Sequence, residues 1–155
     1  MRDMALNKKI VVKMRSDNQK GLFAQANIVE DEVLLTFDGP VLNHPTRFSI
    51  QLDDDKHIEG TSDSNAFLNH SCDANAYVDW KAPCLRAKKG IRKGEEIAYN
   101  YLTTDYELRE PFTCKCGSPQ CMGEIKGFKH LAREEQRKLE PWLPAFLIRK
   151  VDRPS

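Results

Sequence analysis

The chain has 155 residues, of which 40% are hydrophobic and 30% are charged, and its 24 basic and 23 acidic side chains nearly cancel. This length and composition predict one soluble globular domain with a sizeable core. The apolar runs are too short to span a membrane, and a net charge of +1 argues against a dedicated nucleic-acid binder.

Short strands separated by turns are predicted along most of the chain. β-branched or alternating residues recur in six segments, which are residues 10–14, 21–24, 33–37, 47–52, 76–80 and 84–87. Turn residues separate them, such as Asp38-Gly39-Pro40 after the third segment. Turns at a spacing of about 8–12 residues, without a long helical period, predict a mostly β fold.

Residues 26–34 resemble residues 89–97. Both segments place an apolar residue, a polar turn and a glutamate ahead of a predicted strand. One such similarity does not make a repeat protein. It predicts two similar strand–turn–strand corners in one sheet system.

The C-terminal residues 126–155 differ from the rest of the chain. They carry 8 basic and 4 acidic side chains, whereas residues 1–125 carry 16 and 19. Strong helix formers fill residues 130–139 and Pro141 follows them, which predicts a short helix. The apolar residues 145–148 are expected to pack back on the body of the domain.

Five cysteines are present, and three of them, Cys114, Cys116 and Cys121, lie within eight residues. Disulfides would be unusual for thiols in a reducing compartment, so four thiolates around a tetrahedral Zn²⁺ account better for the pattern. The fourth ligand is either Cys72 or Cys84. Cys84 follows Pro83 in an apolar run and is expected to be buried, whereas Cys72 follows a polar turn. We therefore assign one structural Zn²⁺ to Cys72, Cys114, Cys116 and Cys121.

Three motifs occur in a characteristic order. They are Asn69-His70-Ser71-Cys72, then Glu95-Glu96-Ile97-Ala98-Tyr99-Asn100-Tyr101, then Cys114-x-Cys116-x4-Cys121. Together they resemble the SET-domain protein-lysine N-methyltransferases that carry a cysteine-rich post-SET segment, over residues 10–125. The resemblance implies a SET fold of small sheets with a knot-like crossing, a zinc-bound post-SET segment and a short C-terminal helix. The expected parts are a SET domain at 10–103, a post-SET segment at 112–128 and a helical tail at 129–155.

The resemblance also implies which residues hold S-adenosylmethionine. Family members bind it through the Asn-His pair, through a glycine-containing strand start and through the last tyrosine of the second motif. Gln19 stands where the family usually has the first of two glycines. The implied cofactor contacts are Lys20, Gly21, Leu22, Asn69, His70, Tyr101 and, more weakly, Ile125.

Tyr101 and Tyr99 are the expected catalytic residues. Methyl transfer to an amine is mostly a matter of positioning and electrostatics, and in the family the tyrosine matching Tyr101 orients the amine. Tyr99 occupies the position that limits the number of methyl groups, which favours monomethylation. Side chains two apart in a strand share a face, so as strand residues the two tyrosines could both line a channel or both fill the core. A pair of core tyrosines is the competing interpretation, and the other motifs favour the channel.

The function implied is methyl transfer from S-adenosylmethionine to the side-chain amine of a lysine in a histone or another basic protein. The alternatives are a catalytically weak SET-fold protein-binding module, to which Gln19, Asn100 and Ala74 point, and a SET-fold enzyme for a small molecule. Residues 1–9 lack the apolar core of a signal peptide. We expect an intracellular, soluble protein without membrane association, cytoplasmic in a bacterium and nuclear or chromatin-associated in a eukaryote.

Overall fold

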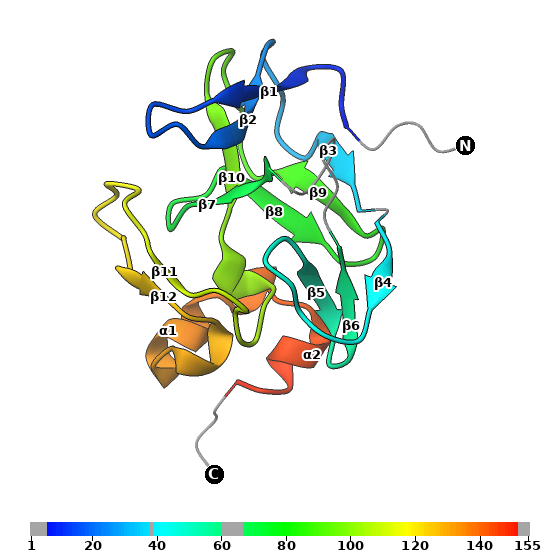
Figure 1. Cartoon of the computed structure of the whole chain (residues 1–155), viewed down its shortest axis with the longest axis vertical. Coiled ribbons are helices and arrows are strands. Elements are labelled where there is room, and N and C mark those ends of the chain that lie inside the picture. The colour runs from blue at the N-terminus through cyan, green and yellow to red at the C-terminus, as the bar shows by residue number, and fades with distance from the viewer. Residues whose placement is uncertain (1–5, 38, 60–66, 152–155) are drawn as a thin grey trace.

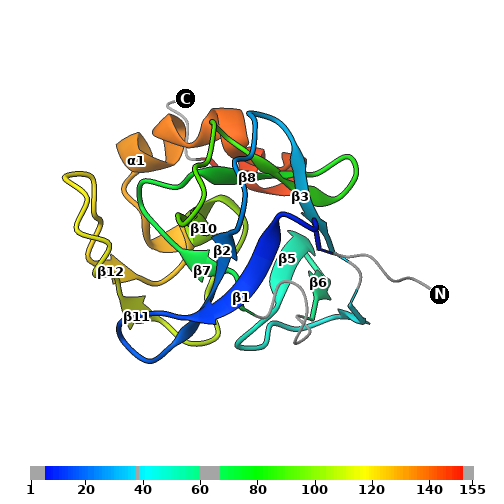
Figure 2. The ribbon, with the colours of Figure 1, turned by 90° about the horizontal axis from the view of Figure 1, so that it is seen from above.

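The computed structural model describes residues 6–37, 39–59 and 67–151 of the chain (Figure 1). Short strands make up the upper and middle parts of the molecule in Figure 1, and the few helices lie below them. The mostly β fold predicted from the sequence is confirmed. Viewed from above, the hairpin of β11 (Phe112–Thr113) and β12 (Glu124–Ile125) stands on the opposite side of the molecule from β5 (Ile50–Asp53) and β6 (Lys56–Ile58) (Figure 2).

A four-stranded sheet with the order β1-β2-β10-β7 carries the motifs singled out in the sequence. Its strands are β1 (Ile10–Met14), β2 (Lys20–Ala24), β10 (Glu96–Tyr99) and β7 (Asn69–His70). β1 and β2 form a hairpin whose turn contains Asn18 with φ of +66°, a conformation that asparagine tolerates better than most residues. β10 is antiparallel to β2 and parallel to β7, so both edges of β10 are paired.

Two three-stranded sheets and a two-stranded hairpin make up the rest of the β structure in the described residues. One has the order β3-β9-β8, with β3 (Val33–Thr36), β9 (Cys84–Ala87) and β8 (Ala76–Asp79). The other has the order β4-β6-β5, with β4 (Val41–Leu42), β6 (Lys56–Ile58) and β5 (Ile50–Asp53). The strand predicted at 47–52 begins only at Ile50, because the Ser49 N–H donates to the Thr46 carbonyl and closes a turn before it.

The two similar corners found in the sequence lie against each other. Ile28 and Ile91 exchange backbone hydrogen bonds of 2.8 and 2.9 Å, and the Lys93 N–H donates to the Asn27 side chain. The corners lead into β3 and β10, which belong to different sheets. The prediction that they share one sheet system was therefore wrong, and their pairing joins two sheets instead.

The main core is built from the inward faces of these sheets. Its fully buried side chains include Leu22, Leu34, Leu85 and Ile97. Cys84 is 2% exposed in β9, which confirms its predicted burial. Cys114 and Ile125 belong to a separate small core with Leu102, beneath the hairpin of β11 (Phe112–Thr113) and β12 (Glu124–Ile125).

The C-terminal segment folds over the lower end of the domain. It contains η3 (Phe128–His130), α1 (Arg133–Lys138), η4 (Glu140–Trp142) and α2 (Ala145–Ile148). The predicted helix 130–139 is shorter than expected, because the Leu131 N–H closes η3 on the Phe128 carbonyl before α1 begins. Phe128, Phe146 and Leu147 form a buried cluster against Tyr106, so the segment packs on the body as predicted.

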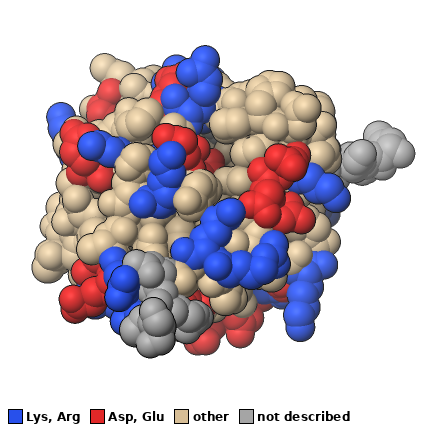
Figure 3. Space-filling model, turned by 90° about the horizontal axis from the view of Figure 1, so that it is seen from below, with Lys and Arg blue, Asp and Glu red and all other residues tan. Residues whose placement is uncertain are grey.

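Basic side chains of the C-terminal segment lie next to acidic ones. The face of the molecule seen from below carries both charges side by side (Figure 3). Lys150 pairs with Asp54 at 2.9 Å, and Lys129 pairs with Glu107 at 3.0 Å. The positive charge of the tail is thus partly balanced within the fold. None of the helices in the described part of the chain has the length and apolar character that crossing a membrane requires.

Candidate functional site

The site is built where β7 runs parallel to the end of β10. Asn69 pairs with Ala98 and His70 pairs with Tyr99. Asn75 holds this arrangement from the side, since its amide donates to the Glu96 carbonyl at 2.9 Å and accepts from the Ala98 N–H at 3.0 Å. The first and second sequence motifs, about thirty residues apart, therefore meet side by side.

His70 connects the first motif to both of the others. Its Nδ1 accepts the backbone N–H of Tyr101 at 3.0 Å, so its proton lies on Nε2, which is 3.2 Å from the Cys72 sulfur. Burial lowers the pKa of His70 to about 4, so the ring is neutral. The imidazole thus has a positioning role that the sequence did not reveal, because the family resemblance assigned mainly its backbone.

Tyr99 and Tyr101 lie together, with ring centroids 5.0 Å apart. They reach this arrangement differently from the prediction, because β10 ends at Tyr99 and Tyr101 begins η2 (Tyr101–Thr103). Asn100 accepts the Leu102 N–H at 2.9 Å and caps that helix, a task that an aspartate would also perform. Tyr101 donates its hydroxyl to the Leu68 carbonyl at 2.5 Å.

Both phenols keep their protons at any physiological pH. Burial raises the pKa of Tyr99 and of Tyr101 well above the ordinary value, and the nearby Asp105 adds to both shifts. The two hydroxyls can therefore donate hydrogen bonds but do not hold negative charge. This favours a role in orienting a substrate over a role as a permanent base.

A cleft of about 900 Å³ contains both tyrosines. Its walls come from the β1–β2 turn, the first and second motifs, and the start of the post-SET segment. Lys20, Asn69 and His70 line it, as do Phe112 and Cys114 to Cys116. Of the expected cofactor and catalytic residues, the cleft is thus lined by Lys20, Asn69, His70, Tyr99 and Tyr101.

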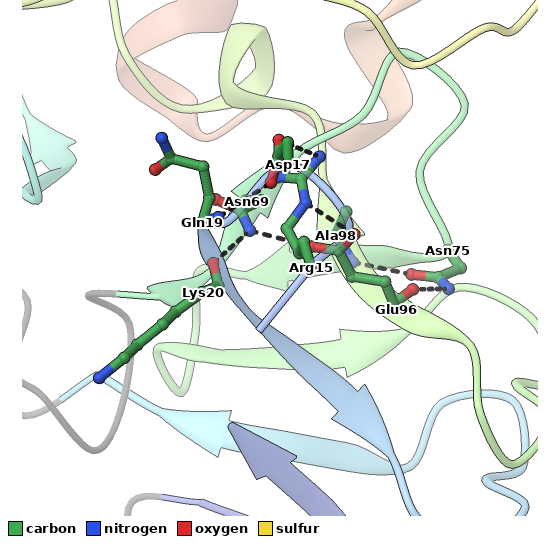
Figure 4. A network of polar contacts seen from close by, with 8 residues as sticks. All are labelled: Arg15, Asp17, Gln19, Lys20, Asn69, Asn75, Glu96 and Ala98. Carbon is green, nitrogen blue, oxygen red and sulfur yellow. Dashed lines mark hydrogen bonds and ion pairs between the residues drawn. The ribbon is translucent and has the colours of Figure 1, made fainter. Parts of the chain in front are cut away.

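One end of this cleft is a polar network around Asn69 (Figure 4). The Asn69 amide donates to the Lys20 carbonyl and to the Glu96 carboxylate, both at 2.9 Å. Arg15 lies 3.5 Å from Glu96 on the other side. The Lys20 side chain points away from the network in Figure 4, so Lys20 contributes its backbone.

Glu96 and Arg15 were not predicted to belong to the site. Glu96 was recognised as part of a motif but given no role, and Arg15 lies in a β-turn region whose sequence gives no signal of ligand binding. Because the two NH₂ protons of Asn69 are already used, its Oδ1 is the atom that remains to accept from a ligand. An ammonium group between Asn69 and Glu96 would find an acceptor and a counter-charge.

Gly21 is required here for the space beside Glu96. A Cβ atom at this position would lie 2.5 Å from the Glu96 carboxylate and 3.1 Å from the Asn69 amide. We expect Gly21→Ala to push Glu96 away from Asn69 and to weaken S-adenosylmethionine binding about tenfold, the value of one charged hydrogen bond. Calorimetric titration measures this. Gly90→Ala is the matched control, because its Cβ would meet only the Ile28 carbonyl, at 3.8 Å, and equal losses in both variants would contradict the prediction.

Two of the predicted cofactor residues lie away from the cleft. Leu22 is fully buried, and its backbone pairs with Val12 and Ile97 in the sheet. Ile125 is also fully buried and pairs with Phe112. Neither side chain reaches the cleft in this structure, so both have structural roles here and a contact with the cofactor stays a prediction.

The four cysteines assigned to zinc come together at the edge of the cleft, which Cys114 and Cys116 line. Their sulfur atoms all lie within 4.8 Å of one another, and those of Cys72 and Cys114 are 3.8 Å apart. A regular tetrahedron with Zn–S bonds of about 2.3 Å has edges of about 3.8 Å. The Met122 N–H also points at the Cys72 sulfur, at 3.3 Å. The donor set and its spacing fit one Zn²⁺, while Cys84 lies elsewhere in β9.

Asp105 is a buried carboxyl group of the cleft that sequence reasoning missed. It is 4% exposed, and its Oδ1 accepts the Gln51 N–H and the Thr104 hydroxyl, both at 3.0 Å. Burial raises the pKa of Asp105 to about 6. Thr103-Thr104-Asp105 looks like an ordinary polar turn in the sequence, because its burial depends on β5, which is 54 residues away.

The raised pKa of Asp105 predicts a pH-dependent cost in stability. The folded state favours the protonated carboxyl. The contribution of Asp105 to folding stability is therefore full below pH 4 and is lost as the pH rises through about 6. Asp105→Asn keeps the acceptor oxygen but does not titrate. Between pH 4 and pH 8 we expect its free energy of unfolding to gain up to about 3 kcal/mol relative to that of the natural chain. Urea unfolding at both pH values measures the difference. A difference that does not change with pH would contradict the prediction.

Several fungal and animal proteins are similar to this chain. The "Histone-lysine N-methyltransferase, H3 lysine-36 specific" of Gibberella zeae is 32% identical over 130 residues, covering 69% of this chain and 14% of that protein. The protein of the same name from Coccidioides immitis is 35% identical, with 69% and 13% covered. "Histone-lysine N-methyltransferase ash1" of Drosophila melanogaster is 35% identical over 95 residues, with 56% and 4% covered. The chain thus spans about one seventh, or less, of the length of these relatives.

The fold is also found among solved structures. The crystal structure of KRYPTONITE in complex with mCHG DNA and SAH matches with a TM-score of 0.61 at 18% identity, covering 77% of this chain and 29% of that one. The family model described as "SET domain" matches residues 19–102, which contain β2 and the first two motifs. With over half of its length matched and its two motifs paired as described, the chain belongs to the SET domain family.

Proposed function

We propose that this chain transfers a methyl group from S-adenosylmethionine to the ε-amine of a lysine in a protein. The observation that carries the proposal is the parallel pairing of β7 with β10, which brings Asn69, His70, Tyr99 and Tyr101 into one cleft. S-adenosylmethionine supplies an activated methyl group on a sulfonium. The chain's own task is then to bind, orient and desolvate the amine.

Each group of the site has a place in this proposal. Asn69 and Glu96 would receive the ammonium of the cofactor's methionine end, with Arg15 close by for its carboxylate. The Leu68 carbonyl and the Tyr101 hydroxyl lie where a lysine amine needs an acceptor and an orienting group. Cys72, Cys114, Cys116 and Cys121 would hold one Zn²⁺ that fixes the post-SET wall of the cleft.

Calorimetric titration with S-adenosylmethionine, followed by transfer of labelled methyl groups to core histones, tests the proposal. Saturable binding that is lost in Asn69→Ala, together with label on lysine, would support it. A folded, zinc-loaded chain without cofactor binding would instead favour a SET-fold protein-binding module. Binding without transfer to any protein, but with transfer to a small amine, would favour the small-molecule alternative.

We further propose that monomethyl-lysine is the main product. Tyr99 is 3% exposed and its hydroxyl lies 3.4 Å from Thr104, so it occupies space beside Tyr101. We expect Tyr99→Phe to remove that hydroxyl and to shift the product toward dimethyl-lysine. Mass spectrometry of the methylated substrate measures the ratio. A natural chain that already makes mostly trimethyl-lysine would contradict the assignment.

The partner proposed is a lysine-presenting protein, and a histone is the first to test because the relatives are named for histone lysines. In a eukaryote this would place the protein in the nucleus or on chromatin. Direct nucleic-acid binding is not part of the proposal. The pairing of Lys129 and Lys150 with acidic residues supports leaving it out.

A further inference from the structure

A line of hydroxyl groups leads from the catalytic tyrosines to Asp105. The Tyr99 hydroxyl lies 3.4 Å from the Thr104 hydroxyl, which lies 3.0 Å from the Asp105 Oδ1. Thr104 has a single hydrogen, which it can donate either to Asp105 or to the Tyr101 carbonyl at 3.1 Å. When it donates to Asp105, its oxygen can accept from Tyr99. The three groups can therefore form one continuous hydrogen-bonded path.

This path is buried and lies next to the cleft. Thr104 is fully buried, Asp105 is 4% exposed and Tyr99 is 3% exposed. Tyr99 and Asp105 both line the cleft. An ionised carboxylate is expensive to bury away from a cation, and in the described part of the chain no positive side chain contributes to its titration. A buried carboxyl group without a cation beside it costs stability, so its presence here points to a function.

The proposed reaction has a need that this group can meet. A lysine side chain enters as an ammonium, with a usual pKa of about 10.4, and must become neutral before it can accept a methyl group. Tyr99 and Tyr101 are the titratable groups that face Asp105, and burial keeps both of them protonated. β5 presents the neutral Gln51 to Asp105, and the Phe128 N–H at the start of η3 donates to the Asp105 backbone carbonyl. Asp105 is thus the group on this path that can take up a proton near neutral pH.

We propose that Tyr99, Thr104 and Asp105 form a proton relay that deprotonates the incoming lysine. The lysine N–H bond breaks as its proton moves to the Tyr99 oxygen. The proton of Tyr99 moves to the Thr104 oxygen, and that of Thr104 moves to the Asp105 Oδ1. The phenol and the hydroxyl end as they began, the lysine becomes a neutral amine, and Asp105 becomes a carboxylic acid that later releases its proton to water in the cleft.

The relay rests on the proposed function and makes Asp105 and Thr104 positioning residues that act through Tyr99. A general base contributes about 10²- to 10⁴-fold to a rate. We therefore expect Asp105→Asn and Thr104→Val to lower kcat about 100-fold at pH 7. The loss should shrink as the pH approaches about 10, where the lysine loses its proton unaided.

The pH dependence of kcat tests the relay, measured with labelled S-adenosylmethionine and core histones between pH 5 and pH 10. The kcat of the natural chain is expected to fall as the pH is lowered, with a midpoint near pH 6. Both variants are expected to lack that midpoint, and their kcat is expected to rise toward high pH. Thr104→Ser restores a hydroxyl and should rescue the natural profile. A pair of variants that keep the natural profile, whatever their absolute rates, would overturn the relay.

A second measurement separates the relay from the proposed function. Carbon-13 NMR of the aspartate carboxyl groups should give one signal that titrates near pH 6 and is missing in Asp105→Asn. If that signal titrates near 4, the relay fails even when lysine is methylated. If the natural chain methylates no lysine at any pH, the proposed function fails instead.

Discussion

Replacing Tyr101 by phenylalanine is expected to lower kcat by about 10²- to 10³-fold, the usual cost of removing one preorganised donor at a reacting centre. The hydroxyl is the only part of the side chain that changes, and it lies 2.5 Å from the Leu68 carbonyl. The ring would stay in place, because it packs against Tyr99, His70 and Phe112. Cofactor affinity should therefore change little, since the hydroxyl acts mainly in the transition state.

The matched control for this variant is Tyr77→Phe. Tyr77 also loses a hydroxyl hydrogen bond, of 2.8 Å to Asp31, but it lines a different cleft with Trp142. Single-turnover rates with labelled S-adenosylmethionine, together with calorimetric affinities, separate binding from chemistry. A Tyr101→Phe variant that keeps its rate within a few-fold of the natural chain would show that the hydroxyl is not catalytic.

The positions of the cysteines agree with the prediction, because the polarity of the neighbouring residues distinguishes Cys84 from Cys72. Cys84 follows Pro83 in an apolar run and is buried in β9, and Cys72 follows a polar turn and reaches the other three thiols. A strand pattern is local in the same way, so the bounds of β1 and β9 agree with the predicted segments. Contacts between residues close in sequence thus account for most of what could be read in advance.

The two tyrosines show how a correct result can follow from a wrong premise. The prediction extended β10 through Tyr101, so that strand alternation would place both rings on one face. The structure ends β10 at Tyr99 and lets Asn100 cap a new helix, yet the rings still meet at 5.0 Å. Local propensity could not reveal this, because the turn depends on the Tyr101 N–H reaching His70 from a distant segment.

The roles of Glu96, Arg15 and Asp105 could not be predicted for a related reason. Each acquires its proposed role through a partner far away in the sequence, such as Asn69 for Glu96 and Gln51 for Asp105. A charged residue in a turn is most often a solvated surface group. Only the packed structure distinguishes a buried carboxyl from an exposed one.

Removing the metal is expected to dismantle one wall of the cleft while leaving the sheets folded. The main core contains none of the four cysteines, whereas Cys114 packs in the small core with Leu102 and Ile125. Structural Zn²⁺ contributes about 10–16 kcal/mol in zinc-finger peptides, which is comparable to the whole stability of a domain. Without it, four thiols would be left close together with little else to hold the post-SET segment.

The loss should reach Tyr101 as well as the wall of the cleft. Cys72 receives the His70 Nε2–H, and His70 in turn accepts the Tyr101 N–H. Partners of this kind, next to a metal ligand, typically change metal affinity or activity by about 10- to 100-fold when they are altered. A chelator is therefore expected to abolish measurable binding of S-adenosylmethionine and to open residues 112–125 to hydrogen exchange, while β1, β2 and β9 stay protected.

The cysteine variants give this prediction its control. Cys116→Ser should lower the zinc content below one per chain and reproduce the effect of the chelator, because Cys116 is a member of the cluster. Cys84→Ser changes a buried thiol outside the cluster and should keep one zinc, even if the free energy of unfolding falls. Elemental analysis and hydrogen exchange measure both. Equal loss of zinc in the two variants, or a metal-free chain that binds the cofactor normally, would contradict the assignment of a structural metal to this wall of the cleft.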